Sequence, residues 1–264
     1  MEGTITFLGT GTSQGVPMIG CSCHVCKSTD SKDNRLRSSA LIDYRGFRIL
    51  IDCGPDFRQQ MLREGVRDVD ALLLTHQHKD HTGGMDDIRA FNYFREAAFP
   101  IYAETRVQES IKREYAYAFY KVKYPGVPDF NLITIDEKPF TVTKRDANGT
   151  KIKLEITPIR IMHYKLPILG FRIGNLAYIT DGSYIPENQF EKLEGLDILI
   201  INAIRHEPHL SHFSLSQALE MIKRIGAKRN CLTHLSHQIG THRELSGELP
   251  ANVMAAYDTL KLHF

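Results

Sequence analysis

The sequence lacks any apolar run close to the roughly 20 residues that a membrane-spanning helix needs. Its N-terminus has no basic segment followed by an apolar stretch, so no secretory signal is expected. Positive and negative side chains nearly cancel, to a formal net charge of +2, so no overall field would attract nucleic acid or a membrane surface. We therefore expect a soluble cytoplasmic protein, with no membrane partner and no nucleic-acid partner.

The chain has only five cysteines, which is an odd number. Three of them, Cys21, Cys23 and Cys26, crowd into the stretch "CSCHVC". This is not the pattern of paired disulfides, and it suits a reducing compartment. Cys53 and Cys231 stand in strand-like runs, where we expect them to be core residues.

The cysteine-rich stretch predicts a structural zinc site, because a closed tetrahedral zinc takes soft thiolate ligands and three are at hand. The alternative is a set of reduced or redox-active thiols, since Cys23 and Cys26 formally make a C-x-x-C pair. A redox pair would not need Cys21, however, and no thioredoxin-like context surrounds it. The fourth ligand is either His24, in the same stretch, or a histidine elsewhere in the chain.

The chain has no internal repeat, low-complexity tract or long linker, so we expect one domain over residues 1–264. Short runs rich in β-branched and apolar residues predict strands, and helical segments lie between them. The strand-like runs are "TITFLG", "SALIDY", "FRILID", "DALLLT", "KIKLEITPIRI", "LAYIT", "DILIINA" and "KRNCLTH". Strands mixed with helices in this order predict an α/β sandwich.

The clearest helix is expected over Ser214–Ile225, with its serine as N-cap and the following glycine as a stop signal. A second helix is expected over about residues 106–122. Residues 104–130 as a whole are expected to be an irregular insertion that ends in the proline-containing loop "KYPGVPDF". Glycine-containing turns predict two hairpins, at Tyr44–Phe47 and Asp146–Thr150.

Three histidines and an aspartate are crowded into Leu72–Gly84, "LLLTHQHKDHTGG". In extended backbone His76 and His78 point to the same side, whereas Asp80 and His81 point in other directions. A loop with two such pairs at the end of a strand can serve two neighbouring metal ions, and imidazole with carboxylate suits zinc, iron or manganese. A solvated histidine-rich loop is the alternative, which the H-x-H-x-D-H spacing disfavours.

The segment "THQHKDH" after an apolar strand resembles the signature of the metallo-β-lactamase superfamily. The resemblance implies a four-layer αβ/βα sandwich around a dinuclear metal site. It also implies the ligands: His76, His78 and His163 for one metal ion, Asp80, His81 and His234 for the other, and Asp181 between them. The three distal ligands each follow a strand-like run, in "IRIMH", "LAYITD" and "CLTH". Asp52, in "ILIDCG", stands where that superfamily has an aspartate that orients a ligand histidine.

A narrower resemblance is carried by "GTGTSQGVPMIGCSCHVC" near the start and "THLSHQ" near the end. Both are similar to the PhnP-type cyclic phosphodiesterases of the carbon–phosphorus lyase pathway. The resemblance implies that His237 completes the structural zinc site with the three cysteines. It also implies that His212, in "HFSL" at the start of a helix, is a catalytic histidine.

Two other features lie outside the implied ligand sets. His206 is the reserve candidate for the catalytic histidine, and His209 has no assigned role. The glycine-rich stretch Gly9–Gly15, "GTGTSQG", is expected to be a turn that brings the cysteines to the site. It is disfavoured as a phosphate-binding loop, because a proline follows where a helix should begin.

The expected function is that of a metal-dependent phosphodiesterase for a small cyclic or nucleotide-like phosphodiester. The resembled enzymes act on 5-phosphoribosyl 1,2-cyclic phosphate. A hydroxide that bridges two zinc or manganese ions would attack phosphorus, and a histidine would protonate the leaving oxygen. Asp80 and His212 are the expected catalytic residues.

Two alternatives stay open: a tRNA 3′-processing-type endonuclease and a non-catalytic metal-binding module. The low net charge and the lack of a basic, glycine-rich arm disfavour the endonuclease. Hydrolysis of a thioester or lactam is disfavoured because the narrower resemblance points to phosphorus. Four arginines are expected to form only a solvated face: Arg35, Arg37, Arg45 and Arg48. A homodimer is among the expectations, with the tyrosine-rich segment Tyr115–Tyr124 as interface or lid.

Overall fold

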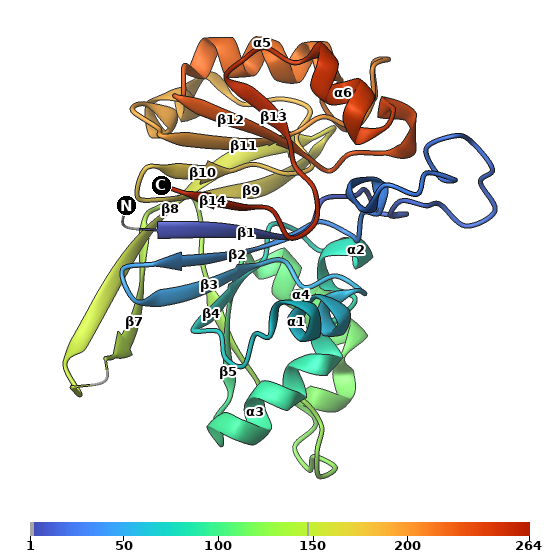
Figure 1. Ribbon diagram of the computed structural model, residues 1–264. Coiled ribbons are helices and arrows are strands. Elements are labelled where there is room, and N and C mark those ends of the chain that lie inside the picture. Colours follow the sequence, from blue (N-terminus) through green and yellow to red (C-terminus); the bar gives the residue numbers. More distant parts are fainter. Residues whose placement is uncertain (1–2, 147) are drawn as a thin grey trace.

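The computed structural model describes residues 3–146 and 148–264. In this part of the chain, two seven-stranded sheets lie face to face, with helices against the outer face of each (Figure 1). The first sheet contains β1 (Gly3–Gly9), β2 (Ser39–Tyr44), β3 (Phe47–Ile51), β4 (Ala71–Leu73), β5 (Phe99–Ala103), β6 (Phe130–Thr134) and β14 (Lys261–His263). Their order across the sheet is β14-β1-β2-β3-β4-β5-β6.

The second sheet has the strand order β13-β12-β11-β10-β9-β8-β7. Its strands are β7 (Phe140–Arg145), β8 (Lys151–His163), β9 (Leu166–Ile173), β10 (Leu176–Tyr178), β11 (Ile198–Asn202), β12 (Arg229–Thr233) and β13 (Val253–Ala255). The α-helices are α1 (Phe57–Glu64), α2 (Lys79–Thr82), α3 (Arg89–Arg95), α4 (Thr105–Glu114), α5 (Leu215–Ile225) and α6 (His242–Glu248). Short 3-10 helices are η1 (Ser31–Asp33), η2 (Met85–Ile88), η3 (Ala116–Phe119), η4 (Glu187–Leu193) and η5 (His237–Ile239).

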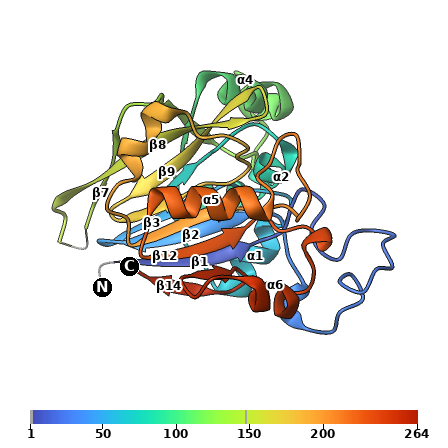
Figure 2. The same cartoon turned by 90° about the horizontal axis from the view of Figure 1, so that it is seen from above.

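Hydrophobic packing holds four layers together. The core between the sheets includes Phe7 and Ile49 from the first sheet and Phe171 and Tyr178 from the second, all fully buried. A second core packs α5 and α6 onto the second sheet, and a third packs α1, α3 and α4 onto the first. Figure 2 shows α5 lying over the strands of the second sheet. The αβ/βα sandwich expected from the sequence is confirmed, and central strands such as β4, β10 and β11 are buried on both faces.

Parallel pairing gathers several loops at one edge of each sheet. In the first sheet β3, β4, β5 and β6 run parallel, and in the second so do β10, β11, β12 and β13. Neighbouring parallel strands end on the same side. The loops that follow β3 and β4, and those that follow β10, β11 and β12, therefore open side by side.

The predicted helix over Ser214–Ile225 is confirmed as α5, whose N-cap serine forms a capping box with Gln217. Gly226 ends the helix in the left-handed conformation, at φ 71°. Both predicted hairpins are present: Tyr44–Phe47 joins β2 to β3, and Asp146–Thr150 joins β7 to β8. Ala147, in the second turn, lies outside the described residues.

The structure differs from the sequence expectation over residues 106–122. α4 already ends at Glu114, and η3 follows it. Tyr115 is buried there, and its hydroxyl donates a hydrogen bond of 2.8 Å to the carbonyl of Thr82. A tertiary contact thus overrides the helical pattern. The segment expected to be irregular is helical in its first half and has neither helix nor strand over residues 120–129.

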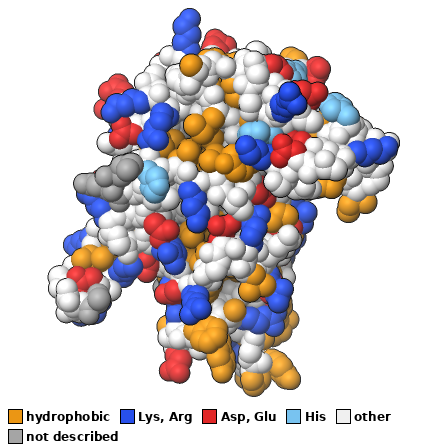
Figure 3. All heavy atoms as spheres, viewed as in Figure 1, with side chains coloured by type: hydrophobic (Ala, Val, Ile, Leu, Met, Phe, Trp, Pro, Cys, Tyr) orange, Lys and Arg blue, Asp and Glu red, His pale blue; other side chains and the backbone are white. Residues whose placement is uncertain are grey.

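The four arginines expected on one solvated face have different environments. Arg35 is only 3% exposed, and its Nη1 donates hydrogen bonds to Thr10 Oγ1 and to the carbonyl of Ala256. Arg37 and Arg48 each pair with an aspartate. The expectation is therefore wrong for Arg35, which ties an N-terminal loop to a C-terminal one. On the face drawn in Figure 3, Lys and Arg side chains are interspersed with Asp and Glu. Among the described residues, no helix is long and apolar enough to span a membrane.

Close packing of two loops explains the glycines beside the histidine cluster. A Cβ atom on Gly54 would lie 2.1 Å from the carbonyl oxygen of Asp80, and one on Gly84 would lie 2.1 Å from that of Gly54. Backbone hydrogen bonds join the same loops, from Cys53 N to His81 O at 2.7 Å and from Gly84 N to Cys53 O at 2.9 Å. The loop after β3 can therefore lie directly against the loop after β4.

We expect Gly54→Ala to lower the free energy of unfolding by about 3 kcal/mol, because the added methyl group overlaps a backbone carbonyl. Gly247→Ala in α6 is the control, since, apart from its chain neighbours and the backbone of its own helix, no atom lies within 4 Å of the added methyl group. It should stabilise the protein by up to about 1 kcal/mol, as alanine favours helix. Urea unfolding measures both variants, and equal stabilities would contradict the close packing of the two loops.

Candidate metal centre

The histidines and aspartates predicted to bind metal converge at the sheet edge described above. They come from four separate segments of the chain, and four of the seven lie in one short stretch, residues 76–81. Their positions are His76 after β4, His78 before α2, Asp80 and His81 within α2, His163 at the end of β8, Asp181 after β10 and His234 directly after β12. The expected loop is partly helical, because α2 makes one turn at its centre.

One group consists of His76, His78 and His163. The distance between ring centroids is 4.5 Å for His76 and His78, 5.1 Å for His78 and His163, and 5.7 Å for His76 and His163. The Nε2 atom of His76 is buried and has no hydrogen-bond partner among the described residues. A nitrogen in this situation suits coordination to a metal ion.

A second group surrounds Asp181. Its Oδ1 lies 3.2 Å from His81 Nε2 and 3.2 Å from His234 Nδ1. Asp80 Oδ2 lies 3.2 Å from the same His81 nitrogen. Ligand atoms of Asp80, Asp181 and His234 all lie within 4.8 Å of one another, and so do those of His76, His81 and Asp181. Asp181 is therefore common to ligand groups that contain His76 and His234, which is compatible with the bridging position expected from the sequence.

Hydrogen bonds hold two of the imidazole rings by Nδ1. Asp52 Oδ2 lies 2.7 Å from Nδ1 of His81, and the backbone carbonyl oxygen of Asp181 lies 2.7 Å from Nδ1 of His163. Such contacts fix the orientation of a ring and leave its Nε2 for a metal ion. The geometry agrees with the orienting role expected for Asp52.

The electrostatics of the centre favour a divalent cation. Burial would raise the pKa of Asp181, but the imidazoles of His234 and His81 outweigh it and hold this pKa well below its usual range. Burial lowers the pKa of His76 well below its ordinary value, so this ring is neutral, as a metal ligand must be. Burial would also lower the pKa of His81, but the nearby carboxylates raise it. The buried carboxylates thus favour positive charge beside them, on His81 or on a metal ion that His81 binds in its neutral form.

Three residues of the centre have left-handed backbone, which non-glycine residues seldom adopt. These are Asp52 at φ 61°, Asp181 at φ 60° and His234 at φ 56°. Each of them follows the end of a strand. Such conformations cost free energy and are often found at functional sites. Here the backbone turns sharply after the end of a strand, at a residue whose side chain lies at the centre.

His212, from the loop between β11 and α5, lies at the same centre and is 8% exposed. Its ring centroid is 4.7 Å from that of His163 and 4.9 Å from that of His234. Its Nδ1 is 4.0 Å from Asp181 Oδ2. Burial lowers the pKa of His212 to about 3. Because His163, Asp181 and His212 also have ligand atoms within 4.8 Å of one another, the position is compatible with proton transfer and with metal ligation.

The other two histidines of this loop lie farther from the centre. The ring of His209 is 5.1 Å from that of His212. His206 faces the opposite way, with Nε2 3.3 Å from the carbonyl oxygen of Ile239 and 3.8 Å from Glu248 Oε1. The structure therefore brings His212 to the centre, and the reserve candidate His206 does not reach it.

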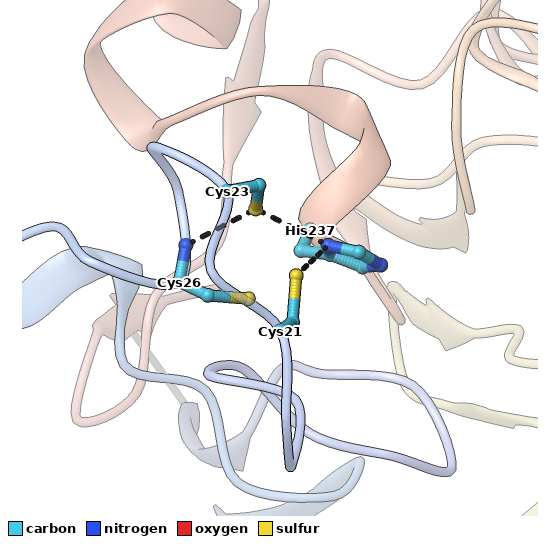
Figure 4. Close-up of side chains that lie close together, drawn as sticks. All are labelled: Cys21, Cys23, Cys26 and His237. Atoms are coloured by element: carbon cyan, nitrogen blue, oxygen red, sulfur yellow. Dashed lines mark hydrogen bonds between the residues drawn. The ribbon is translucent and has the colours of Figure 1, made fainter.

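A separate cluster brings together Cys21, Cys23, Cys26 and His237, whose side chains point toward one another in Figure 4. The Sγ atoms of Cys21 and Cys23 each lie 3.4 Å from His237 Nδ1. One ligand atom from each of the four residues lies within 4.8 Å of the others. Three thiols and an imidazole at this spacing fit a closed tetrahedral zinc site.

His237, and not His24, supplies the fourth side chain of this cluster. The side chain of His24 is 68% exposed, and its Nε2 contacts Glu244 Oε2 at 3.2 Å. A hydrogen bond with His237 lowers the pKa of Cys23 to about 6. This shift favours the thiolate, which is the form that binds metal.

One short segment connects the two clusters, because His234 belongs to the first and His237 to the second. Leu235, between them, donates a backbone hydrogen bond of 2.8 Å to the carbonyl of Thr10. Thr10 lies in the glycine-rich stretch Gly9–Gly15. This agrees with the expectation that the stretch is a turn that carries the cysteines toward the site.

Three supporting residues were not predicted from the sequence. Ser38 Oγ lies 3.1 Å from Nδ1 of His234. Thr75 Oγ1 lies 2.9 Å from Nδ1 of His76. The amide of Asn202 makes hydrogen bonds of 2.7 and 2.9 Å with the backbone of Gly182, directly after Asp181 in the chain. Only Thr75 had a sequence signal, its place beside the histidine cluster.

We expect Asp52→Ala to lower the zinc affinity of the histidine and aspartate centre about 10- to 100-fold, because His81 loses the carboxylate that holds its Nδ1. Asp43→Ala is the control, since Asp43 lies on β2 and pairs with Arg48 at the surface. Metal retained against graded chelator concentrations, measured by elemental analysis, gives the affinity. Unchanged retention in Asp52→Ala would contradict the orienting role.

Comparison with known sequences places these residues in a family. The model described as "Beta-lactamase superfamily domain" matches residues 47–235. An octanoyltransferase of Porphyromonas gingivalis is 44% identical over 257 residues, 96% of this chain and 50% of the relative, so the chain spans about half the length of that protein. A ribonuclease Z of Methanopyrus kandleri is 25% identical over 287 residues, 98% of this chain and 97% of the relative.

Comparison with solved structures agrees with this placement. A crystal structure described as a new diphosphatase from the PhnP family has a TM-score of 0.88 and 38% identity, and the match covers 99% of this chain and 98% of that one. The region matched by the family model also contains Asp52, the histidine cluster and His234. The chain belongs to the metallo-β-lactamase superfamily.

Proposed function

We propose that this metallo-β-lactamase-fold hydrolase is a phosphodiesterase for a small cyclic or nucleotide-like phosphodiester, similar to 5-phosphoribosyl 1,2-cyclic phosphate. The observation that carries the proposal is one centre in which three groups of potential metal ligands share Asp181, and His212 belongs to one of these groups. The 38% identical structure is described as a diphosphatase of the PhnP family, which supports phosphoryl chemistry.

The proposal assigns two divalent ions to the centre. His76, His78 and His163 would hold one ion, Asp80, His81 and His234 would hold the other, and Asp181 would serve both. Zinc and manganese both suit this set of imidazoles and carboxylates. When bound, two such ions would lower the pKa of a water molecule and stabilise the charge on the phosphoryl oxygens.

The side chains then have separate tasks. Asp80 and Asp181 keep the centre negative, so that it attracts cations, and Asp52 holds His81 in its orientation. His212 donates a proton to the leaving oxygen, which departs poorly as an alkoxide. Burial disfavours the protonated form of His212, whereas the Asp181 carboxylate favours it. An anionic phosphate bound beside His212 would favour it further, so we propose that this proton is held mainly in the substrate complex.

Acyl hydrolysis or transfer is a second candidate function. It is favoured by the 44% identical relative that is named an octanoyltransferase, although the chain spans only half of that protein. The centre proposed for a phosphoryl group could also polarise an acyl carbonyl. An octanoyl thioester is the substrate that separates this candidate from the first.

Processing of tRNA is a third candidate, because the chain is similar to a ribonuclease Z over 98% of its length. The identity there is only 25%. A net charge of +2 and the burial of Arg35 give this chain little of the basic surface that binds a long nucleic acid. We therefore rank this candidate below the small phosphodiester.

We also propose that the cluster of three cysteines and His237 holds a structural zinc ion. Cys23→Ser should then remove about one zinc ion per chain and lower the melting temperature. His24→Ala is the control and should change neither value, because His24 points away from the cluster toward Glu244. Elemental analysis and calorimetry measure both effects. An unchanged zinc content in Cys23→Ser would argue against the site.

The first test of the proposed function is hydrolysis of bis(p-nitrophenyl) phosphate by the protein loaded with zinc or manganese. We expect turnover, and about three metal ions per chain when the structural zinc is included. His212→Ala should lose about 10²-fold or more in kcat/KM while it keeps its metal ions. His206→Ala is the matched control, from the same loop, and should keep its activity.

Other results of these measurements would contradict the proposal or change the role of His212. Loss of a metal ion in His212→Ala would make His212 a ligand instead of the proton donor. Full metal loading without turnover of phosphodiester or diphosphate substrates would contradict the proposal. Turnover of an octanoyl thioester by the same preparation would then favour the second candidate, and no turnover of any substrate would favour a metal-binding module.

A further inference from the structure

α1 and α3 enclose an apolar groove of about 730 Å³. Phe57, Met61 and Phe91 form its buried floor. At its rim, Leu62 is 65% exposed and Phe94 is 79% exposed. Hydrophobic side chains gather at the lower end of the molecule in Figure 3, where Figure 1 shows α3. Large apolar side chains exposed together around a hollow are typical of a surface that binds a partner.

The groove is lined by two arginines and one aspartate, so positive side chains outnumber negative ones there. Arg58 and Arg67 line it and are exposed, and neither side chain has an ion-pair or hydrogen-bond partner among the residues that the structure describes. Other arginines of the same region are all paired: Arg63 with Asp258, Arg89 with Asp86 and Arg95 with Asp68. Asp87 is the single carboxylate in the lining. The groove thus combines an apolar floor with unmatched positive charge.

We propose that this groove binds an amphipathic helix of a partner protein, with apolar anchors that enter it and acidic residues that meet Arg58 and Arg67. Anchors at positions i, i+4 and i+7 of a helix span about 10 Å, close to the length of the two helices that form the groove. Acidic flanks would match the arginines and guide association.

A second copy of this chain fits the groove less well. A two-fold interface places the same patch on both subunits. The unmatched arginines of one copy would then lie near those of the other, which is unfavourable. In the Porphyromonas gingivalis relative, moreover, the matching part is only half of the protein, so this fold is joined there to a further segment of similar length.

The proposal is tested with the metal-loaded full chain and a phage-displayed library of amphipathic helices. The flanking positions of the library carry Glu or Lys at equal frequency. We expect selection to enrich Glu-flanked helices about tenfold or more over Lys-flanked ones, and the double variant Arg58→Glu/Arg67→Glu to reverse this preference. Leu62→Ala/Phe94→Ala should abolish the enrichment. Tyr124→Ala is the control, because Tyr124 is 80% exposed and lies outside the groove.

Metal content and thermal unfolding show whether the variants stay folded, which we expect because the changed side chains are at the surface. Absence of enrichment, or equal enrichment of both flank types, would overturn the proposal. A dimer in sedimentation velocity that dissociates in Leu62→Ala/Phe94→Ala would identify the occupant as a second copy instead. Binding to anionic lipid vesicles that the same variant abolishes, without enrichment of any helix, would identify a membrane surface.

Discussion

Burial of ionisable side chains at one edge of two sheets is the constraint on which the rest of this structure depends. Asp52, His76, His81 and Asp181 have almost no exposed surface. Carboxylates and imidazoles in such a place cost free energy unless they are hydrogen-bonded or bound to a cation. The contact of Asp52 with His81 and the left-handed backbone at three strand ends serve this requirement. The close packing at Gly54 holds the loops together.

One short segment of the chain contributes a residue to each of the two clusters of potential metal ligands. His234 and His237 lie in one short segment, which a backbone hydrogen bond from Leu235 ties to Thr10. A structural ion among the cysteines would therefore also support the position of His234. In this arrangement the cysteine-rich loop supports the segment that carries His234.

Family membership limits the chemistry but does not select the substrate. The chain is similar in sequence to proteins named octanoyltransferase and ribonuclease Z, and in structure to one described as a diphosphatase, so its function has to be argued from the site. In the proposed reaction the proton donor is His212, a buried histidine whose Nδ1 lies 4.0 Å from Asp181 Oδ2. The apolar groove between α1 and α3 is a separate feature, which concerns a partner and not the reaction.

The sequence by itself determined the fold class, helix α5 and the residues of both clusters, because these depend on local spacing and on a specific family pattern. Tertiary structure decided features that depend on contacts between residues far apart in the sequence. It buried Arg35, ended α4 at Glu114 through the contact of Tyr115, and recruited Ser38 and Asn202 to the centre. Long-range packing chooses such partners, since residues far apart in the chain meet only when the sheets have stacked.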